Sequence, residues 1–356
     1  MKKTVMLCVV AILCFSMILA GCGKSDNSRN QAQSPKTEGG QSAEQAKPVK
    51  MSIGLLKLTS SAPIFIAMEK GFFKEANIEV TPQWFEAAQP IAVATASGSV
   101  DVGATGITAS LYNMISSGQK LLIVADKGRE QKGFSSSALL VHKDSAIQSI
   151  QDLKGKKIGV TQTGSTFHYM AGRLLEKYGL SLSDVEITPL GKLNALNDTL
   201  KSKQVDAILT AEPNISLILN EGYGKVIAQV GDEIDYQISA IFYSQKFADN
   251  KDAAVRFMKV YNKATQYYYD AVLAKKDGKP APGQNYDEVV NIVAKYTDQT
   301  ADVVKQGLPY MDRDGKLLAE DIKTQIDWYY KAKMIEKPLD YKTIVNTEFL
   351  EEALKK

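Results

Sequence analysis

The sequence predicts an α/β fold built as two lobes. Strand patterns alternate with helix patterns over most of the chain, which is typical of sheets flanked by helices. The globular part runs from Val49 to Lys356, and this length favours two lobes over one large core. After Asp249 only helix patterns remain, so we expect the C-terminal part to cover the sheets.

The first residues have the pattern of an export signal. Lys2 and Lys3 precede an uncharged, mostly apolar run from Thr4 to Ala20. The ending Leu19-Ala20-Gly21-Cys22 resembles a bacterial lipobox, in which the signal is cleaved before a lipidated cysteine. We therefore expect residues 1–21 to be removed and Cys22 to anchor the protein to the extracytoplasmic face of the cell membrane. A transmembrane helix is the alternative, but the run is at the short end of the ~17–25 residues that a span needs.

Residues 22–48 are expected to form a disordered tether. From Gly23 to Pro48 the chain has no aromatic residue and no Val, Ile, Leu or Met, so it cannot bury enough apolar surface to fold. Cys8 and Cys14 would leave with the signal. The mature chain would then have no free thiol for catalysis or zinc binding.

Charge and composition limit the class of partner. The net charge is +3 and lysines are interspersed with carboxylates, so no basic block of the kind that binds nucleic acid is present. His142 and His168 are the only histidines. We expect no metal site and no cofactor.

The predicted strands and helices are described in the order in which they occur along the chain. Val49 to Leu55 alternates apolar and polar residues, as a strand does. Pro63 suits the first turn of the next helix, which Ser60 or Ser61 is expected to cap and Gly71 to end. Parallel sheets are expected from this strand and from further strands at 78–80, 100–104, 121–125, 157–160 and 205–209. Helix stripes are expected to be buried at Leu111, Leu174, Val293, Ile322 and Tyr329.

Ligands bind at the carboxyl ends of strands in such sheets, where helix N-termini offer unpaired N–H groups. Small polar residues occupy four of these junctions, at 59–61, 105–108, 163–166 and 211–214. Together they favour a pocket for a small solute that is anionic or strongly hydrogen-bonding. The alternative is that each hydroxyl only caps its own helix.

Lys127, Arg129 and Lys132 lie in the link between the presumed lobes. We expect a solvated hinge there. An oxyanion clamp formed by Arg129 is the alternative.

Five segments, in order, resemble the solute-binding lipoproteins of ABC importers in the nitrate/sulfonate/taurine (NMT1/THI5-like) family. The segments are PIFIAMEKGFFKEANIEV (63–80), ASGSVDVG (96–103), LKGKKIGV followed by GSTFHY (153–169), VDA followed by EP (205–213), and the stretch from Asp314 to Trp328.

The resemblance implies solute capture by lobe closure rather than catalysis, on a two-lobed, type II periplasmic-binding-protein-like fold with the ligand cleft between lobes. Lobe one would be 49–142 and 241–356, and lobe two 143–240. A monomer would close on its solute and deliver it to permease and ATPase subunits. The implied ligand-binding positions are Ser60, Ser61, Trp84, Gly106, Thr108, Gly164, Ser165, Thr166 and Glu212.

Two departures leave the solute open. Ala211 stands where the family often has Trp, and Glu212 would repel an anion but would suit an amine or a pyrimidine. A sulfonate, taurine or nitrate-like oxyanion is the favoured class, and a thiamine-pyrimidine precursor or another amine is the alternative. A ligand sensor without transport is also open. An enzyme like the fungal pyrimidine synthases is disfavoured, since those carry a cysteine-rich motif and work inside cells.

Overall fold

The computed structural model describes residues 47–276 and 279–355, and the chain from Lys47 onward forms one compact unit. The expected signal peptide (1–21), the lipidation site Cys22 and nearly all of the expected tether (22–48) lie outside the described residues. Among the helices of the described ranges, none has the length and apolarity needed to cross a bilayer.

The first sheet has five strands in the order β2-β1-β3-β10-β4. β1 runs parallel to both of its neighbours, whereas β10 runs antiparallel to β3 and to β4. The strands are β1 (Val49–Leu55), β2 (Ile78–Trp84), β3 (Val102–Gly106), β4 (Leu121–Glu130) and β10 (Tyr236–Ser244).

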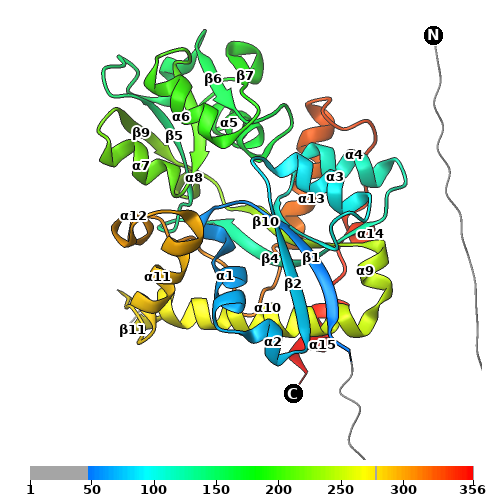
Figure 1. The fold of residues 1–356 in the computed structure, drawn as a ribbon. Helices are drawn as coiled ribbons and strands as arrows, with labels where there is room; N and C mark the ends of the chain where they lie inside the picture. Colours follow the sequence, from blue (N-terminus) through cyan, green and yellow to red (C-terminus); the bar gives the residue numbers. More distant parts are fainter. Residues whose placement is uncertain (1–46, 277–278, 356) are drawn as a thin grey trace, which may run out of the picture. The chain divides into compact units, whose positions relative to one another are not determined.

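The second sheet has five strands in the order β7-β6-β8-β5-β9 and is drawn above the first in Figure 1. β6 runs parallel to β7 and β8, and β5 runs antiparallel to β8 and β9. The strands are β5 (Ser137–His142), β6 (Lys157–Val160), β7 (Glu186–Pro189), β8 (Ala207–Ala211) and β9 (Gly224–Gln229).

The predicted α/β class is confirmed, but the sheets are mixed where parallel sheets were expected. The antiparallel members are β5 and β10, and each is the first strand after the chain passes from one sheet to the other. Every residue of β10 is buried. A strand covered on both faces lacks the alternation that marks a half-buried strand, so the pattern does not reveal it.

The chain passes between the sheets after β4, which ends at Glu130, and after β9, which ends at Gln229. A lobe boundary at 142/143 would separate β5 from its partners β8 and β9, and a boundary at 240/241 would divide β10. We therefore propose that lobe one comprises 47–130 and 236–355, that lobe two comprises 137–229, and that the two crossings lie between them.

Helices connect the strands and cover both sheets. The connecting helices are α1 (Ala62–Glu69), α2 (Phe72–Glu75), α3 (Ala88–Ala96), α4 (Ala109–Ser116), α5 (Thr166–Lys177), α6 (Leu193–Lys201), α7 (Asn214–Asn220), α8 (Val230–Glu233) and α9 (Gln245–Asp249), with 3-10 turns η1 (Thr59–Ser61), η2 (Ile150–Leu153) and η3 (Leu182–Asp184). The stripe residues predicted from the sequence, Leu111, Leu174, Val293, Ile322 and Tyr329, are all buried.

The C-terminal part is mainly helical, as predicted, but it is not free of strands. Its helices are α10 (Lys251–Val272), α11 (Tyr286–Thr297), α12 (Ala301–Lys305), α13 (Ala319–Lys331), α14 (Tyr341–Ile344) and α15 (Glu348–Leu354). The two-residue strands β11 (Lys275–Lys276) and β12 (Lys279–Pro280) pair with each other. A pair this short has no periodicity that a sequence pattern can reveal.

The C-terminal helix α13 packs against the second lobe. Figure 1 shows it beside the centre of the molecule. The Trp328 indole N–H donates a hydrogen bond to Glu176 of α5 at 3.0 Å. A Cβ on Gly172 of α5 would lie 2.2 Å from the Trp328 ring, so the two helices approach this closely only because glycine is there. Segments far apart in the sequence therefore meet where α13 contacts α5.

Candidate functional site

A small, partly open cavity lies between the two sheets, and strands of both sheets end at it. Its volume is ≈ 50 Å³, which is space for about three to five water molecules by the same measure. The first lobe contributes Leu56, Leu58, Thr59, Ser60, Ala87, Ala88, Thr105, Gly106, Lys127, Ile238 and Ser239; Ser136 lies in a crossing; the second lobe contributes Thr161, Thr166, Phe167, Leu193, Ala211 and Glu212.

Lys127 of β4 is the cation in this wall. The side chain is 2% exposed, and its ammonium group donates a hydrogen bond to the Ser60 hydroxyl at 2.9 Å. Among the described residues it forms no ion pair with a carboxylate. Burial disfavours the charged form and lowers the pKa of Lys127 from 10.5 to about 7, although Asp126 acts in the opposite direction. The cavity therefore holds an amine that an anion would readily charge.

Three hydroxyls in the wall have no hydrogen-bond partner among the described residues. They belong to Thr59 of η1, Thr105 of β3 and Ser239 of β10, which are 1%, 1% and 5% exposed. A buried polar group without a partner costs about 1–3 kcal/mol. All three come from the same lobe as Lys127, so this side of the cavity offers a set of donors that lacks an acceptor.

Glu212 follows β8 on the other side of the cavity. It is 6% exposed, and its Oε2 accepts a hydrogen bond from the Ser216 N–H at 3.1 Å. Burial raises the pKa of Glu212, and the hydrogen bonds from Ser216 oppose this effect. A Cβ on Gly307 would lie 2.2 Å from the carboxyl carbon of Glu212. The absence of a side chain at Gly307 thus leaves the room that the Glu212 carboxylate occupies.

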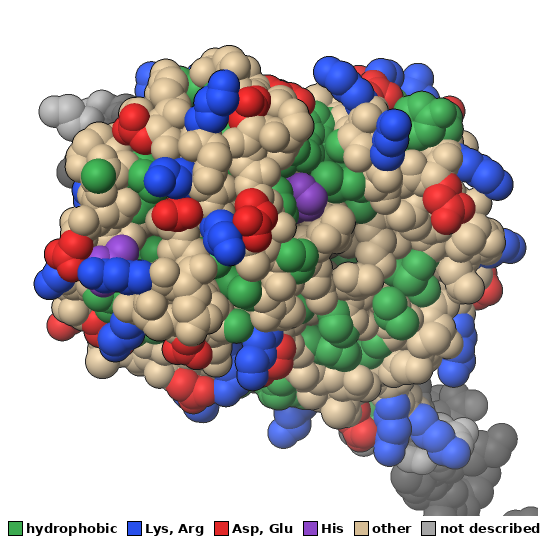
Figure 2. All heavy atoms as spheres, turned by 90° about the horizontal axis from the view of Figure 1, so that it is seen from above, with side chains coloured by type: hydrophobic (Ala, Val, Ile, Leu, Met, Phe, Trp, Pro, Cys, Tyr) green, Lys and Arg blue, Asp and Glu red, His purple; other side chains and the backbone are tan. Residues whose placement is uncertain are grey.

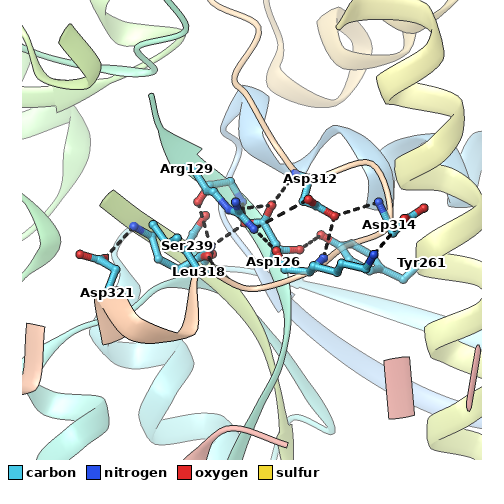
Figure 3. A network of polar contacts seen from close by, with 11 residues as sticks. Asp126, Arg129, Ser239, Tyr261, Asp312, Asp314, Leu318 and Asp321 are labelled. Carbon is cyan, nitrogen blue, oxygen red and sulfur yellow. Dashed lines mark hydrogen bonds and ion pairs between the residues drawn. The ribbon is translucent and has the colours of Figure 1, made fainter. Parts of the chain in front are cut away.

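A polar network around Asp126 connects β4, which carries Lys127, with β10 and the C-terminal segment (Figure 3). The neighbouring residue, Asp126, is fully buried. Its carboxylate accepts hydrogen bonds from the backbone N–H of Gly128 at 2.9 Å, from the side chain of Gln237 at 2.5 Å and from the backbone N–H of Asp312 at 2.7 Å. β4, β10 and the C-terminal segment are thereby fixed to one another, and with them the residues that face the cavity.

Of the nine ligand-binding residues predicted from the sequence, four line the cavity: Ser60, Gly106, Thr166 and Glu212. Gly106 ends β3 in the first lobe, and Thr166 begins α5 in the second. A Cβ on Gly106 would lie 2.6 Å from the methyl carbon of Thr166. The two lobes meet here at a distance that only glycine permits.

Two predicted residues cap helices instead. The Thr108 hydroxyl accepts a hydrogen bond from the Leu111 N–H at 3.3 Å at the start of α4. The Ser165 hydroxyl accepts one from the His168 N–H at 3.2 Å at the start of α5. Neither residue lines the cavity. Both match the alternative in which the hydroxyl only caps its own helix.

The other three predicted residues also lie away from the cavity. The Ser61 hydroxyl donates to the Leu56 carbonyl at 3.0 Å rather than capping α1. Trp84 is 41% exposed and lines a separate depression with Pro213. Gly164 adopts a φ of 73° and donates its N–H to His168 at 3.1 Å. The sequence pattern identified these junctions but not which of their side chains face the cavity.

The sequence pattern also does not predict that Lys127 lines the cavity. Lys127 was expected in a solvated hinge, but it is buried, so that expectation is wrong for this residue. Arg129 lies instead beside Asp126, with Nε 3.7 Å from Oδ2, and donates a hydrogen bond to the Lys316 carbonyl. One signal was available: Lys127 follows the apolar strand pattern at 121–125 after a single intervening residue, Asp126.

Within the described residues, no group of three or more His, Cys, Asp or Glu side chains is placed to hold a metal ion. Lysine and arginine side chains alternate with carboxylates over the face in Figure 2, so no large patch of one sign appears on that face.

Comparison with known proteins shows what the chain is similar to. The sequence model of the family described as NMT1/THI5 like matches residues 58–271. A putative aliphatic sulfonates-binding protein of Bacillus subtilis (strain 168) is 28% identical over 365 residues, which cover 99% of this chain and 97% of that protein.

Two further comparisons agree with this similarity. A putative thiamine biosynthesis protein of Haemophilus influenzae is 29% identical over 213 residues, which cover 58% of this chain and 64% of that protein. The solved structure of the alkanesulfonate-binding protein SsuA from Xanthomonas axonopodis pv. citri, bound to MOPS, has a TM-score of 0.70 and 22% identity. It covers 85% of this chain and 99% of its own, and it confirms the predicted periplasmic-binding-protein-like fold.

The buried amine predicts a characteristic pH dependence of stability. In the folded state the pKa of Lys127 is about 7, whereas in the unfolded chain it is near 10.5, so the unfolded state binds more protons between these values. The free energy of unfolding of the ligand-free protein, relative to that of Lys127→Met, is therefore expected to rise by about 1.4 kcal/mol per pH unit above pH 7. Urea unfolding at pH 7 and pH 9 measures this difference.

Lys132 is exposed, and the variant Lys132→Met is the matched control. Its difference from the wild type is expected to stay constant between the two pH values. A constant difference for Lys127→Met as well would show that the Lys127 amine is solvated.

Proposed function

The chain belongs to the NMT1/THI5-like family, and from this premise we propose that it is the substrate-binding protein of an ABC importer that captures a small oxyanion, with sulfonates as the favoured class. The observation that carries the proposal is the donor set around Lys127. The ammonium group and the hydroxyls of Thr59, Thr105 and Ser239 belong to residues that line the same cavity, and three of these four groups have no partner in the described protein.

A sulfonate matches this donor set chemically. It stays ionised at physiological pH, and its three oxygens accept several hydrogen bonds at once. A hydrogen bond between a charged donor and a charged acceptor is roughly twice as strong as a neutral one. The sulfonates-binding relative from Bacillus subtilis, which is similar over nearly the whole chain, supports this class.

Binding is proposed to act through lobe closure. Residues of both lobes form the wall, and the Ala109 N–H of the first lobe donates a hydrogen bond to the Gly164 carbonyl of the second at 2.9 Å. A solute held by both lobes stabilises the closed arrangement over the open one. The closed monomer would then dock on permease and ATPase subunits, with no bond made or broken in the solute.

A pyrimidine or amine is the alternative solute class, and a ligand sensor and an enzyme are the alternative roles. A pyrimidine or amine would use Glu212 and leave Lys127 unpaired; the similarity to a putative thiamine biosynthesis protein keeps that class open. A sensor would bind solute in the same way but would not need a permease. An enzyme like the pyrimidine synthases is disfavoured, because all three cysteines lie within residues 1–22.

The cation is expected to dominate affinity. Lys127→Met should weaken binding of the preferred solute by about 2–4 kcal/mol, or roughly 30- to 1,000-fold, because it removes the charged partner in a desolvated site. The solute is chosen first by a thermal-shift screen of taurine, alkanesulfonates, nitrate, bicarbonate and aminopyrimidines. Titration calorimetry then gives the dissociation constants.

Lys132→Met is again the control and should bind like the wild type. A preferred aminopyrimidine, or an unchanged dissociation constant in Lys127→Met, would contradict the oxyanion proposal. Small-angle scattering of the same samples tests closure, since the bound solute should reduce the radius of gyration.

We also propose that lipid on Cys22 holds the protein at the extracytoplasmic face of the cell membrane, on the basis of the Leu19-Ala20-Gly21-Cys22 sequence. Cys22→Ser should remove the acceptor thiol and abolish incorporation of labelled palmitate into the protein in cells. Cys14→Ser, within the expected signal, is the control and should still be labelled. Equal labelling of Cys22→Ser and the wild type would exclude this anchor.

A further inference from the structure

Helix α13 is held by the first lobe along one of its faces. The Gln325 side chain is fully buried. It donates a hydrogen bond to the Gln237 carbonyl of β10 at 2.9 Å and accepts one from the Tyr112 hydroxyl of α4 at 3.2 Å. Both partners belong to the first lobe, so α13 is fixed to that lobe.

Two neighbouring aromatic side chains of α13 contact α5 and its N-cap in the second lobe. The Trp328 indole N–H donates a hydrogen bond to Glu176 at 3.0 Å, and the Tyr329 hydroxyl donates one to the Ser165 carbonyl at 3.2 Å. Both rings also lie against Tyr169, with ring centroids 5.0 and 5.4 Å away. Trp328 and Tyr329 are 8% and 0% exposed. These two buried side chains therefore bridge the lobes.

Gly172 of α5 makes room for the Trp328 ring. A Cβ at this position would lie 2.2 Å from Cζ2 of the indole, a distance at which one of the two groups must move. Glycine inside a helix is less favourable than alanine, so α5 by itself would form more readily with alanine here. The close fit of Gly172 and Trp328 thus serves the contact between the lobes and not the formation of α5.

The bridge reaches the turn that carries a cavity residue. Ser165, whose carbonyl accepts the Tyr329 hydroxyl, directly precedes Thr166, which lines the cavity. The adjacent Gly164 carbonyl accepts the Ala109 N–H of the first lobe at 2.9 Å. Two successive carbonyl groups of the second lobe are thus bound by donors of the first. Neither α13 ring lines the cavity, so their effect on binding passes through the positions of the lobes.

We propose that Trp328 and Tyr329 form an interlobe latch, which stabilises the closed arrangement and thereby raises the affinity for solute from outside the cavity. The inference rests on the lobe closure of the proposed function. The apparent dissociation constant rises as the closed, binding-competent fraction falls. Because the latch acts on this fraction alone, weakening it should reduce the affinity for every solute by the same factor, whatever the chemistry of the solute.

Gly172→Ala tests the latch, because the added methyl group displaces the Trp328 ring in the closed arrangement while alanine suits the helix. Titration calorimetry should give dissociation constants for taurine and for propane-1-sulfonate that both rise by the same factor, about 5- to 50-fold. In a Trp328→Ala background, Gly172→Ala should have no further effect, since the ring that it displaces is gone. Tyr330→Phe removes an exposed hydroxyl from the same helix; it is the control and should bind like the wild type.

Trp328 also reports on the latch directly. The chain has two tryptophans, and Trp84→Phe leaves Trp328 as the only one. In this variant, saturating taurine or propane-1-sulfonate should shift the fluorescence emission to shorter wavelength, because closure removes the Trp328 indole from water. Melting temperatures check that each variant is folded. The fluorescence measurement leaves the latch residues intact, so it stands even if Gly172→Ala fails to fold.

An emission maximum that the solute leaves unchanged, or dissociation constants of Gly172→Ala equal to those of the wild type, would overturn the latch and leave the proposed function intact. A loss of affinity that differs between the two sulfonates would also contradict it, because the substitution would then act on the cavity itself. Absence of binding of both sulfonates to the wild type would instead contradict the proposed sulfonate class. The latch is then tested with the best binder of the thermal-shift screen, for which it predicts the same factor.

Discussion

The arrangement of the site depends on one costly feature, a lysine ammonium group buried where no carboxylate pairs with it. Within residues 47–276 and 279–355, the only hydrogen bond of the Lys127 ammonium group is to the Ser60 hydroxyl, and the surrounding wall also holds hydroxyls without a partner. Native proteins satisfy most buried polar groups, and under the proposed function a bound acceptor would complete this cluster. An anion that pairs with these groups would remove the free-energy cost of leaving them without partners, and this gain would favour binding.

The fold keeps this lysine in place through a carboxylate that faces away from the cavity. Asp126 binds the backbone of Asp312 and the side chain of Gln237, and Gln237 in turn accepts the Leu318 N–H at 2.8 Å. Strands β4 and β10, which lie at the ends of the two crossings between the sheets, are thus tied to the C-terminal segment. The helical C-terminal part therefore contributes to the site without lining it.

The sequence predicts the parts of this structure that depend on local pattern. β1 at Val49–Leu55 and β6 at Lys157–Val160 have the predicted bounds, and the strand-to-helix junctions do meet at one cavity. What it does not predict depends on contacts between distant segments. The orientation of Lys127, the meeting of Gly307 with Glu212, and the unpartnered state of Ser239 follow from tertiary packing that no local period encodes.

Proton uptake on binding tests the central role of Lys127 most directly. Calorimetry at pH 8 in two buffers with different ionisation enthalpies gives the number of protons taken up with the preferred sulfonate. Because the pKa of Lys127 in the free protein is about 7 and a bound anion raises it, the wild type should take up close to one proton per solute. Binding without proton uptake at pH 8 would show that the anion does not charge Lys127, and would contradict the account.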